Sequence, residues 1–309
     1  MSTEKIVGRF APSPTGPLHF GSLSCALASY LDVKNLGGKW LVRIEDIDPP
    51  REIKGSSSQI LGQLEAHGLC WDDKELFQST RLDAYQDSLD ILKQNNLAYH
   101  CECSRQRVNS LEGIYDNRCR QSHLPSTDNA TRLQLNQPHE FVEFVDKIAG
   151  RYVQSLAKDV GDFVIRRRDN LFSYQLAVTV DDQYQNITHV MRGSDLLDST
   201  PRQIYLQHCL GFTQPQYAHL PVATNPLGQK LSKQNLASSL ISGQEALNIW
   251  SALNWLNQSP PNDLRKWSVS EILAWAIAHW DSTNMYVVNM SNAHTKKGLN
   301  QLPSSSSAH

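Results

Sequence analysis

Residues 9–22, RFAPSPTGPLHFGS, decide the fold because they join a buried strand to a helix through a turn rich in proline and glycine. Residues 6–10 are mostly apolar and predict the strand, which the prolines of the turn then end. Apolar residues recur at helical spacing from 23 to 31, so a helix is expected to begin just after His19. A helix N-terminus offers backbone N–H groups and a partial positive charge to anions, so this turn predicts a phosphate site.

The following residues continue the alternation of strands and helices. Residues 39–44 predict a second strand, which the prolines of EDIDPP at 45–50 end. Apolar spacing predicts helices around 60–64 and 82–92. This order predicts an α/β fold with a Rossmann-like parallel sheet. Later segments are expected to add strands at 131–135, 140–145, 162–166 and 218–223, and helices at 201–210, 243–256 and 269–280.

The composition limits the class of protein. The chain has 309 residues, of which 40% are hydrophobic, enough to bury a sizeable core. No apolar run approaches the ~20 residues that span a membrane, and the N-terminus lacks the apolar core of a signal peptide. A cytoplasmic protein without membrane contact is therefore expected. The net charge of −2 gives no general attraction for nucleic acid. An RNA partner would need a local basic patch such as Arg166, Arg167 and Arg168, although such a run is also typical of a solvated strand end.

Two segments carry candidate phosphate ligands. In the first turn, Gly16 and Gly21 allow the backbone to approach a ligand, and the ring of His19 can donate to a phosphate oxygen. The second segment is KLSK at 230–233, whose two lysines suit a mobile loop that closes over a triphosphate. Taken alone, each segment has an alternative interpretation, as a helix-capping turn and as a solvent-exposed loop.

Together, the two segments resemble the signatures of class I aminoacyl-tRNA synthetases in their glutamyl and glutaminyl form. The first signature of that family ends in a His-x-Gly-His-like turn, and Ser22 holds the last position here, as is common in the glutamyl branch. The second signature usually has Met where this chain has Leu231. The resemblance implies a ligase in which His19, Lys230 and Lys233 are catalytic, and in which ATP, accompanied by Mg²⁺, is bound by His19, Gly21, Ser232 and Lys233.

A third set of residues fits an amino acid with two carboxylates. Such a ligand needs cations for its carboxylates and an anion for its ammonium group. Arg9 and Arg192 could grip a carboxylate, Glu45 could pair with the ammonium, and Tyr174 could form a wall, although each could also be an ordinary surface or core residue. Residues 192–197, RGSDLL, resemble a segment of the glutamyl branch, where the arginine favours glutamate over its amide. The resemblance implies that L-glutamate is bound by Arg9, Phe10, Ala11, Pro12, Ser13, Glu45, Tyr174 and Arg192.

Three of the six cysteines predict a metal site. Cys101, Cys103 and Cys119 lie close together in a polar stretch, and three thiolates in a reducing compartment indicate Zn²⁺. Candidates for the fourth ligand are His100, Tyr115 and His123, and coordination chemistry alone favours His123. The spacing resembles the zinc site of short paralogues of the glutamyl-tRNA synthetases, in which tyrosine is the fourth ligand. That resemblance implies one structural zinc held by Cys101, Cys103, Tyr115 and Cys119. Cys25, Cys70 and Cys209 have apolar neighbours and are expected in the core.

The resemblance to these short paralogues also implies a division of the chain. Full-length glutamyl-tRNA synthetases resemble it over roughly 5–240 and then continue into an anticodon-binding region. The expected limits are 1–100 and 191–240 for the two halves of the catalytic domain, 101–190 for a zinc-bearing, acceptor-binding insertion, 241–297 for a helical C-terminal region and 298–309 for a disordered tail.

The same short paralogues imply an unusual acceptor. In them, glutamate is activated to glutamyl-adenylate without tRNA and is then transferred to the cyclopentenediol of queuosine, at the wobble position of the anticodon of tRNA(Asp). The partners implied here are thus L-glutamate, ATP and tRNA(Asp) carrying queuosine, and the protein is expected to be a monomer. Two alternatives remain open, which are a minimal glutamyl-tRNA synthetase that charges the tRNA 3′ end and a catalytically inactive RNA-binding paralogue.

Overall fold

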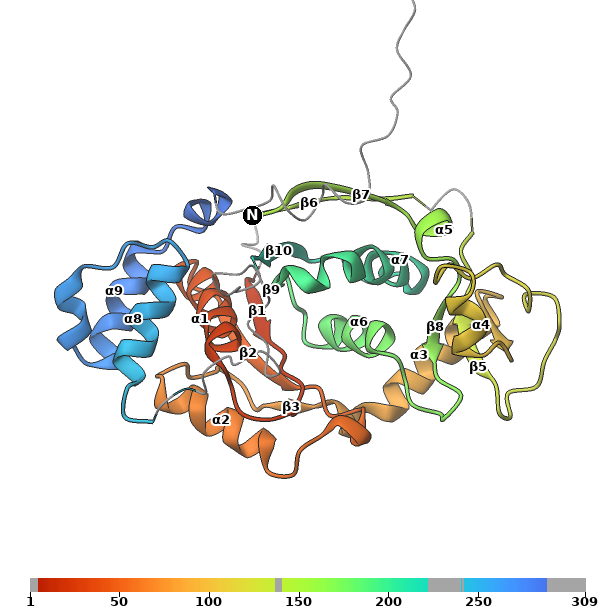
Figure 1. Cartoon of the computed structure of the whole chain (residues 1–309), viewed down its shortest axis with the longest axis horizontal. Helices are drawn as coiled ribbons and strands as arrows, with labels where there is room; N and C mark the ends of the chain where they lie inside the picture. Colours follow the sequence, from red (N-terminus) through yellow and green to blue (C-terminus); the bar gives the residue numbers. More distant parts are fainter. Residues whose placement is uncertain (1–4, 137–140, 222–239, 241, 288–309) are drawn as a thin grey trace, which may run out of the picture.

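The fold is built around a seven-stranded sheet in the middle of an elongated molecule (Figure 1). The structure is a computed structural model that describes residues 5–136, 141–221, 240 and 242–287. The strand order is β3 (Leu76–Phe77), β2 (Lys39–Ile44), β1 (Val7–Phe10), β9 (His189–Gly193), β10 (Gln216–Leu220), β6 (Phe141–Asp146) and β7 (Gly150–Ser155). Neighbouring strands are parallel from β3 through to β6, and β7 returns antiparallel to β6. The predicted α/β fold with a parallel sheet is confirmed.

Helices cover both faces of this sheet, and a second, smaller sheet lies at one end of the molecule. The α-helices are α1 (Phe20–Asn35), α2 (Ser56–Ala66), α3 (Leu82–Gln94), α4 (Arg105–Asn109), α5 (Leu156–Asp159), α6 (Tyr174–Tyr184), α7 (Thr200–Leu210), α8 (Glu245–Trp255) and α9 (Val269–His279). Short 3-10 helices lie at Pro49–Arg51, Gln78–Arg81, Ser194–Ser199, Asn262–Lys266 and Ser282–Val287. The smaller, antiparallel sheet consists of β4 (Ala98–Cys101), β5 (Ala130–Leu133) and β8 (Phe163–Arg166). It lies near α4, at the end opposite the α8–α9 pair (Figure 1).

The two faces of β2 meet different helices. Trp40, Val42 and Ile44 point to one face, where they share a core with α1 and with the α8–α9 pair. Arg43 points to the other face and donates to Asp182 on α6. The alternation of a strand therefore separates an apolar face, which supports α1, from a face that carries charges.

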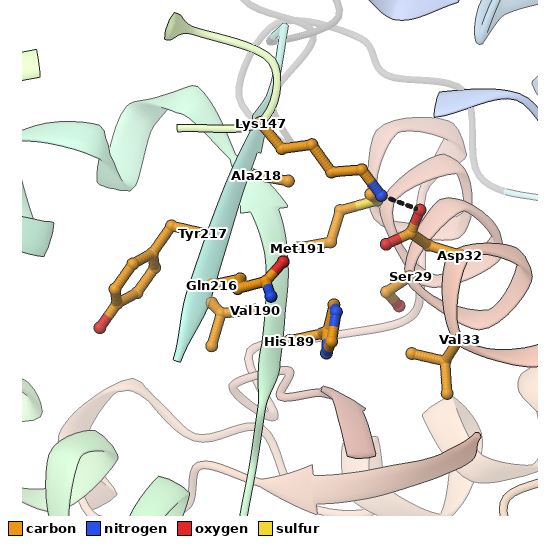
Figure 2. A pocket seen from close by; sticks show the side chains of 10 residues that line it. All are labelled: Ser29, Asp32, Val33, Lys147, His189, Val190, Met191, Gln216, Tyr217 and Ala218. Carbon is orange, nitrogen blue, oxygen red and sulfur yellow. Dashed lines mark hydrogen bonds and ion pairs between the residues drawn. The ribbon is translucent and has the colours of Figure 1, made fainter. Parts of the chain in front are cut away.

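A polar contact joins three segments that are far apart in the sequence. Lys147, which follows β6, pairs with Asp32 on α1 at 2.8 Å, and Figure 2 shows its side chain reaching from the sheet to the helix. Trp280, just after α9, donates its indole N–H to the same carboxylate at 3.1 Å. Asp32 thus links β6 and the C-terminal helices to α1, the helix that begins at the predicted phosphate site. Within the part of the chain that the structure describes, no helix has the length and apolar character needed to cross a bilayer.

Most local expectations hold, and the misses have physical reasons. The helix expected after His19 is α1, and Gly211, with a φ of 69°, ends α7 as the sequence predicts. The sequence did not predict α6, because its residues 176–182 are all buried and it therefore lacks the polar face that produces helical periodicity. The core position expected for Cys70 is wrong, because the chain has already left α2 there and the side chain is exposed.

The small sheet contains β5 and β8, where strands were expected at 131–135 and 162–166, and β4 at Ala98–Cys101. In the same stretch, β6 and β7 extend the main sheet beside β10. The predicted domain limits remain a prediction, and the tail expected at 298–309 lies outside the described residues.

Candidate active site

The order in which successive strands are added to the main sheet reverses between β1 and β9. From β1 the chain crosses over α1 to β2 on one side, and from β9 it crosses over α7 to β10 on the other. Ligands of open α/β sheets bind beyond the carboxyl ends of the strands at such a switch point. Arg9 lies near this end of β1 and Arg192 near this end of β9. The topology therefore brings together two residues that the sequence singled out 183 positions apart, as their numbers show.

A cavity of about 390 Å³ opens at the turn after β1, between His19 and Gly21 on one side and Asp195 on the other. His19 caps α1, and its Nδ1 accepts the backbone N–H of Ser22 at 3.2 Å. The neutral ring therefore carries its proton on Nε2, the atom that can donate to a phosphate oxygen. The first turn of α1 contains no acidic residue, so the positive end of the helix dipole is not neutralised. This geometry suits a triphosphate.

A second cavity of about 230 Å³ adjoins the first and is lined by Glu45 and Tyr174. Ser13 and Thr15 line both cavities, so ligands in the two cavities would be neighbours. The backbone N–H of Glu45 donates to the Pro12 carbonyl at 3.0 Å, which fixes the end of β2 against the turn after β1. The two loops therefore hold the shared wall together.

Arg9 is buried beside this wall and pairs with a residue that the sequence did not suggest. Its Nε and Nη2 donate to the two carboxylate oxygens of Asp182 at 3.1 and 3.2 Å. Arg43 donates to the same carboxylate at 2.7 Å. Since Asp182 uses the Nε–Nη2 edge of Arg9, a ligand carboxylate would have to approach the Nη1–Nη2 end of the guanidinium group, where N–H donors remain.

Glu45 is a nearly buried carboxylate without a hydrogen bond at Oε1. Its side chain is 8% exposed, and Arg43 Nη2 lies 3.9 Å from Oε1, too far for a hydrogen bond. Burial raises the pKa of Glu45 to about 7, although Arg43 and Arg9 act in the opposite direction. A ligand ammonium group placed in the second cavity would supply the missing partner, so Glu45 fits the predicted ammonium site.

Arg192 is also buried, and all three of its guanidinium nitrogens have partners. Nη1 donates to the Tyr174 hydroxyl at 3.2 Å, Nη2 to Thr200 Oγ1 at 2.8 Å and Nε to His219 Nε2 at 3.1 Å. Tyr174 lines the second cavity, so Arg192 lies directly behind its wall. The structure thus brings Arg192, Tyr174 and Glu45 to one place.

The other predicted ligands of the active site divide into two groups. Phe10 and Pro12 line the first cavity, and Ala11 lies between them in the same turn. Lys230, Ser232 and Lys233 lie outside the described residues.

The basic run at 166–168 is engaged in intramolecular contacts. Arg167 lines the second cavity and pairs with Asp48 at 3.1 Å. Arg168 donates to the backbone carbonyl of Glu102. A role for this run in RNA binding remains a prediction.

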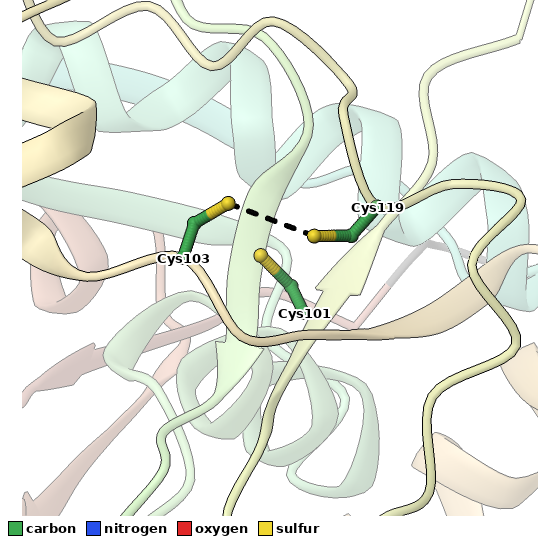
Figure 3. Close-up of side chains that lie close together, drawn as sticks. All are labelled: Cys101, Cys103 and Cys119. Atoms are coloured by element: carbon green, nitrogen blue, oxygen red, sulfur yellow. Dashed lines mark hydrogen bonds between the residues drawn. The ribbon is translucent and has the colours of Figure 1, made fainter.

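The three clustered cysteines converge on one point at the end of β4, with their sulfur atoms facing one another (Figure 3). Their Sγ atoms all lie within 4.8 Å of one another, a spacing that could hold a metal ion. The Tyr115 hydroxyl lies 3.4 Å from Cys101 Sγ and 3.9 Å from Cys103 Sγ. Of the other candidates, His100 contacts Thr131 and His123 is exposed. The donor set fits zinc, which prefers thiolates in a closed structural site.

Sequence reasoning missed several residues that support the site. Asp182, Asp146, His219 and Thr200 each contact a predicted ligand or its partner. The register pairs Arg192 on β9 directly with His219 on β10, which is the reason for their contact. A histidine within the strand predicted at 218–223 was the one available signal for this set.

The chain is similar to known proteins over most of its length. The family described as tRNA synthetases class I (E and Q), catalytic domain, matches residues 5–254. A glutamyl-Q tRNA(Asp) synthetase of Pseudomonas fluorescens is 50% identical over 281 residues, which are 91% of this chain and 94% of that protein. Another, of Dechloromonas aromatica, is 49% identical and covers 88% and 93%. The crystal structure of a glutamate-tRNA synthetase from Elizabethkingia anophelis has a TM-score of 0.76 at 26% identity, over 92% of this chain and 67% of that one.

Proposed function

The chain belongs to the glutamyl-Q tRNA(Asp) synthetases, within the class I tRNA synthetases of the E and Q type, and we propose that it activates L-glutamate with ATP and transfers it to queuosine in the anticodon of tRNA(Asp). The observation that carries the proposal is the pair of adjoining cavities at the switch point of the sheet. One begins at a helix N-terminus suited to phosphate, and the other combines a buried carboxylate with arginines behind its wall.

The chemistry follows from this arrangement. The α-carboxylate of glutamate is ionised at neutral pH, so it attacks the α-phosphorus of ATP without a general base and expels pyrophosphate. Glu45 holds the ammonium group, while Arg192 and Arg9 hold carboxylate charge. His19 stabilises charge on the phosphates, and Lys230 and Lys233 are proposed to do the same. Alignment of the two ligands across the shared wall lowers the barrier most, because the protein forms no covalent bond in this step.

The proposal includes Mg²⁺ with the ATP and a structural zinc on the cysteine cluster. Zinc there would join β4 to the loop that carries Cys119 and would thereby shape the surface of the small sheet. In the transfer step, a hydroxyl of the queuosine cyclopentenediol attacks the acyl carbon of glutamyl-adenylate, which forms the ester and releases AMP. The proposed activity belongs in the cytoplasm, where tRNA and reduced cysteine thiols coexist.

The acceptor is tested by charging with labelled glutamate. Queuosine-containing tRNA(Asp), the same tRNA without queuosine, and tRNA(Glu) are compared, and label is expected in the first alone. Periodate treatment, with the queuosine diol protected, then separates the base from the 3′ end, because oxidation destroys only the unprotected terminal diol. Label on tRNA(Glu) alone would instead identify an enzyme that charges the 3′ end. If glutamate did not promote ATP–pyrophosphate exchange at all, the chain would be an inactive paralogue.

The state of Glu45 predicts how activation depends on pH. Because the pKa of Glu45 is raised to about 7, the carboxylate that binds the ammonium group is lost as the pH falls through that value. We expect kcat/KM for glutamate in ATP–pyrophosphate exchange to fall about tenfold for each pH unit below that pKa. Glu45→Gln should be slow at every pH and should lose this dependence. A wild-type profile that is flat across neutral pH would show that Glu45 does not bind the ammonium group in its ionised form.

A further inference from the structure

A buried polar chain leads from Arg192 away from the cavity to β6. His219, on the neighbouring strand, accepts from Arg192 Nε through its Nε2 at 3.1 Å. Its Nδ1 lies 2.6 Å from Asp146 Oδ2, at the end of β6. The side chains of His219 and Asp146 are both 0% exposed, so neither can be satisfied by solvent. Asp146, His219 and Arg192 therefore form one continuous chain across three neighbouring strands.

The hydrogen-bond partners fix the direction of this chain. Asp146 Oδ1 accepts the backbone N–H groups of Ile148, Ala149 and His219 at 2.9, 2.7 and 3.1 Å. Burial opposes ionisation of Asp146, but the bonds from His219 and the backbone outweigh it and hold its pKa below the usual range. Arginine can only donate, so His219 Nε2 has to accept and Nδ1 has to carry the proton.

His219 is therefore neutral in a defined tautomer. Burial lowers the pKa of His219, and Arg192 lowers it further, while Asp146 acts in the opposite direction. The other groups around it are the Thr200 hydroxyl at 3.1 Å and the Tyr217 ring, stacked at 6.2 Å. With Nε held by His219 and Nη2 held by Thr200, the guanidinium group is oriented so that Nη1 points towards Tyr174 and the cavity.

We infer that Asp146 and His219 are positioning residues that hold Arg192 in the orientation in which it binds glutamate. This rests on the proposed function, because it assumes that Arg192 contacts the substrate. The alternative is that the chain only satisfies buried polar groups in the core. A structural role of that kind would change stability but would not separate the binding of glutamate from the binding of ATP.

Asp146→Asn is the most informative variant. Its amide oxygen would stay with the three backbone donors, so its NH₂ group would face His219 Nδ1. The ring would then have to carry its proton on Nε2, opposite the Nε–H of Arg192, and two donors would confront each other. An Asp→Asn change has the same effect on the tautomer of a catalytic Asp–His pair.

We expect Asp146→Asn and His219→Leu to raise the KM for glutamate roughly ten- to hundredfold in ATP–pyrophosphate exchange, with the KM for ATP within about twofold of wild type. His219→Gln keeps a donor and an acceptor and should lose less. Tyr217→Phe is the matched control, because it removes the bond from Gln207 to the Tyr217 hydroxyl, a buried hydrogen bond on the same strand, and leaves the chain intact. Its KM values should stay at the wild-type level.

The inference is overturned if the KM for glutamate is unchanged in Asp146→Asn and His219→Leu, or if the KM values for glutamate and ATP rise equally. In either case, glutamate-dependent exchange by the wild type would still uphold the proposed function. No glutamate-dependent exchange by the wild type would overturn both. If the variants do not fold, ¹⁵N-histidine spectra of the wild type decide, with His219→Gln used for assignment. The Nδ1–H tautomer is expected, and the Nε2–H tautomer or an imidazolium at neutral pH would refute the inference.

Discussion

Arg192→Met is expected to lower kcat/KM for glutamate by about two to four orders of magnitude, while the KM for ATP stays close to that of the wild type. The side-chain carboxylate of glutamate would then be buried without its cation, and removing one partner of a buried pair costs about 3–5 kcal/mol. The rest of the site would remain, because the partners of Arg192 are neutral groups that lose only one donor each. ATP–pyrophosphate exchange at varied glutamate measures the effect.

Arg81→Met is the matched control for this prediction. Arg81 pairs with Asp181 at 3.2 Å and stacks on the Tyr184 ring at 3.7 Å, so it is an arginine that contacts α6, as Arg192 does through Tyr174. It lines neither of the two cavities. Asp181 keeps its bonds from Gln78 and Tyr85, so exchange activity should stay within about threefold of wild type. If Arg192→Met were no worse than Arg81→Met, Arg192 would not bind the substrate.

The sequence predicted those parts of the structure that local chemistry determines. His19 caps α1 where the prediction begins a helix, because the turn chemistry and the apolar spacing lie within a few residues of each other. Lys39–Ile44 is a strand with the predicted limits, since its own residues alternate and prolines follow it. The three clustered cysteines also converge, because short sequence separation leaves them little freedom to separate.

Partners that lie far apart in the sequence could not be predicted. Arg9 pairs with Asp182, which is 173 residues away on a helix whose buried residues conceal its periodicity. Nothing near Asp146 indicates that β6 pairs with β10, and that pairing is what places Asp146 beside His219. The residues that touch a ligand can be inferred from motifs, whereas those that orient them depend on strand order and register.

Loss of the cysteine cluster is expected to have the largest effect on stability. Structural zinc sites contribute apparent binding free energies of about 10–16 kcal/mol to small domains. We expect the purified chain to contain about one zinc, and Cys101→Ser to contain none and to unfold the small sheet at a lower temperature. Exchange activity should persist, because the cluster lines neither cavity, whereas glutamylation of tRNA should fall. Metal analysis and thermal unfolding measure the change, and Cys209→Ser, at the end of α7, is the control.

The fourth ligand can be separated from its alternatives within the same experiment. The Tyr115 hydroxyl lies beside two of the sulfurs and accepts the backbone N–H of Cys119 at 2.9 Å, so it already lies at the centre of the cluster. His123 is exposed and has a φ of 46°. Tyr115→Phe keeps the ring and its packing under Arg132, at 3.8 Å, and removes only the oxygen. It should weaken zinc binding at least about tenfold in competition with a chromophoric chelator, since loss of even a supporting partner costs that much. His123→Ala should bind zinc like the wild type, and the reverse order of the two variants would assign the fourth position to His123.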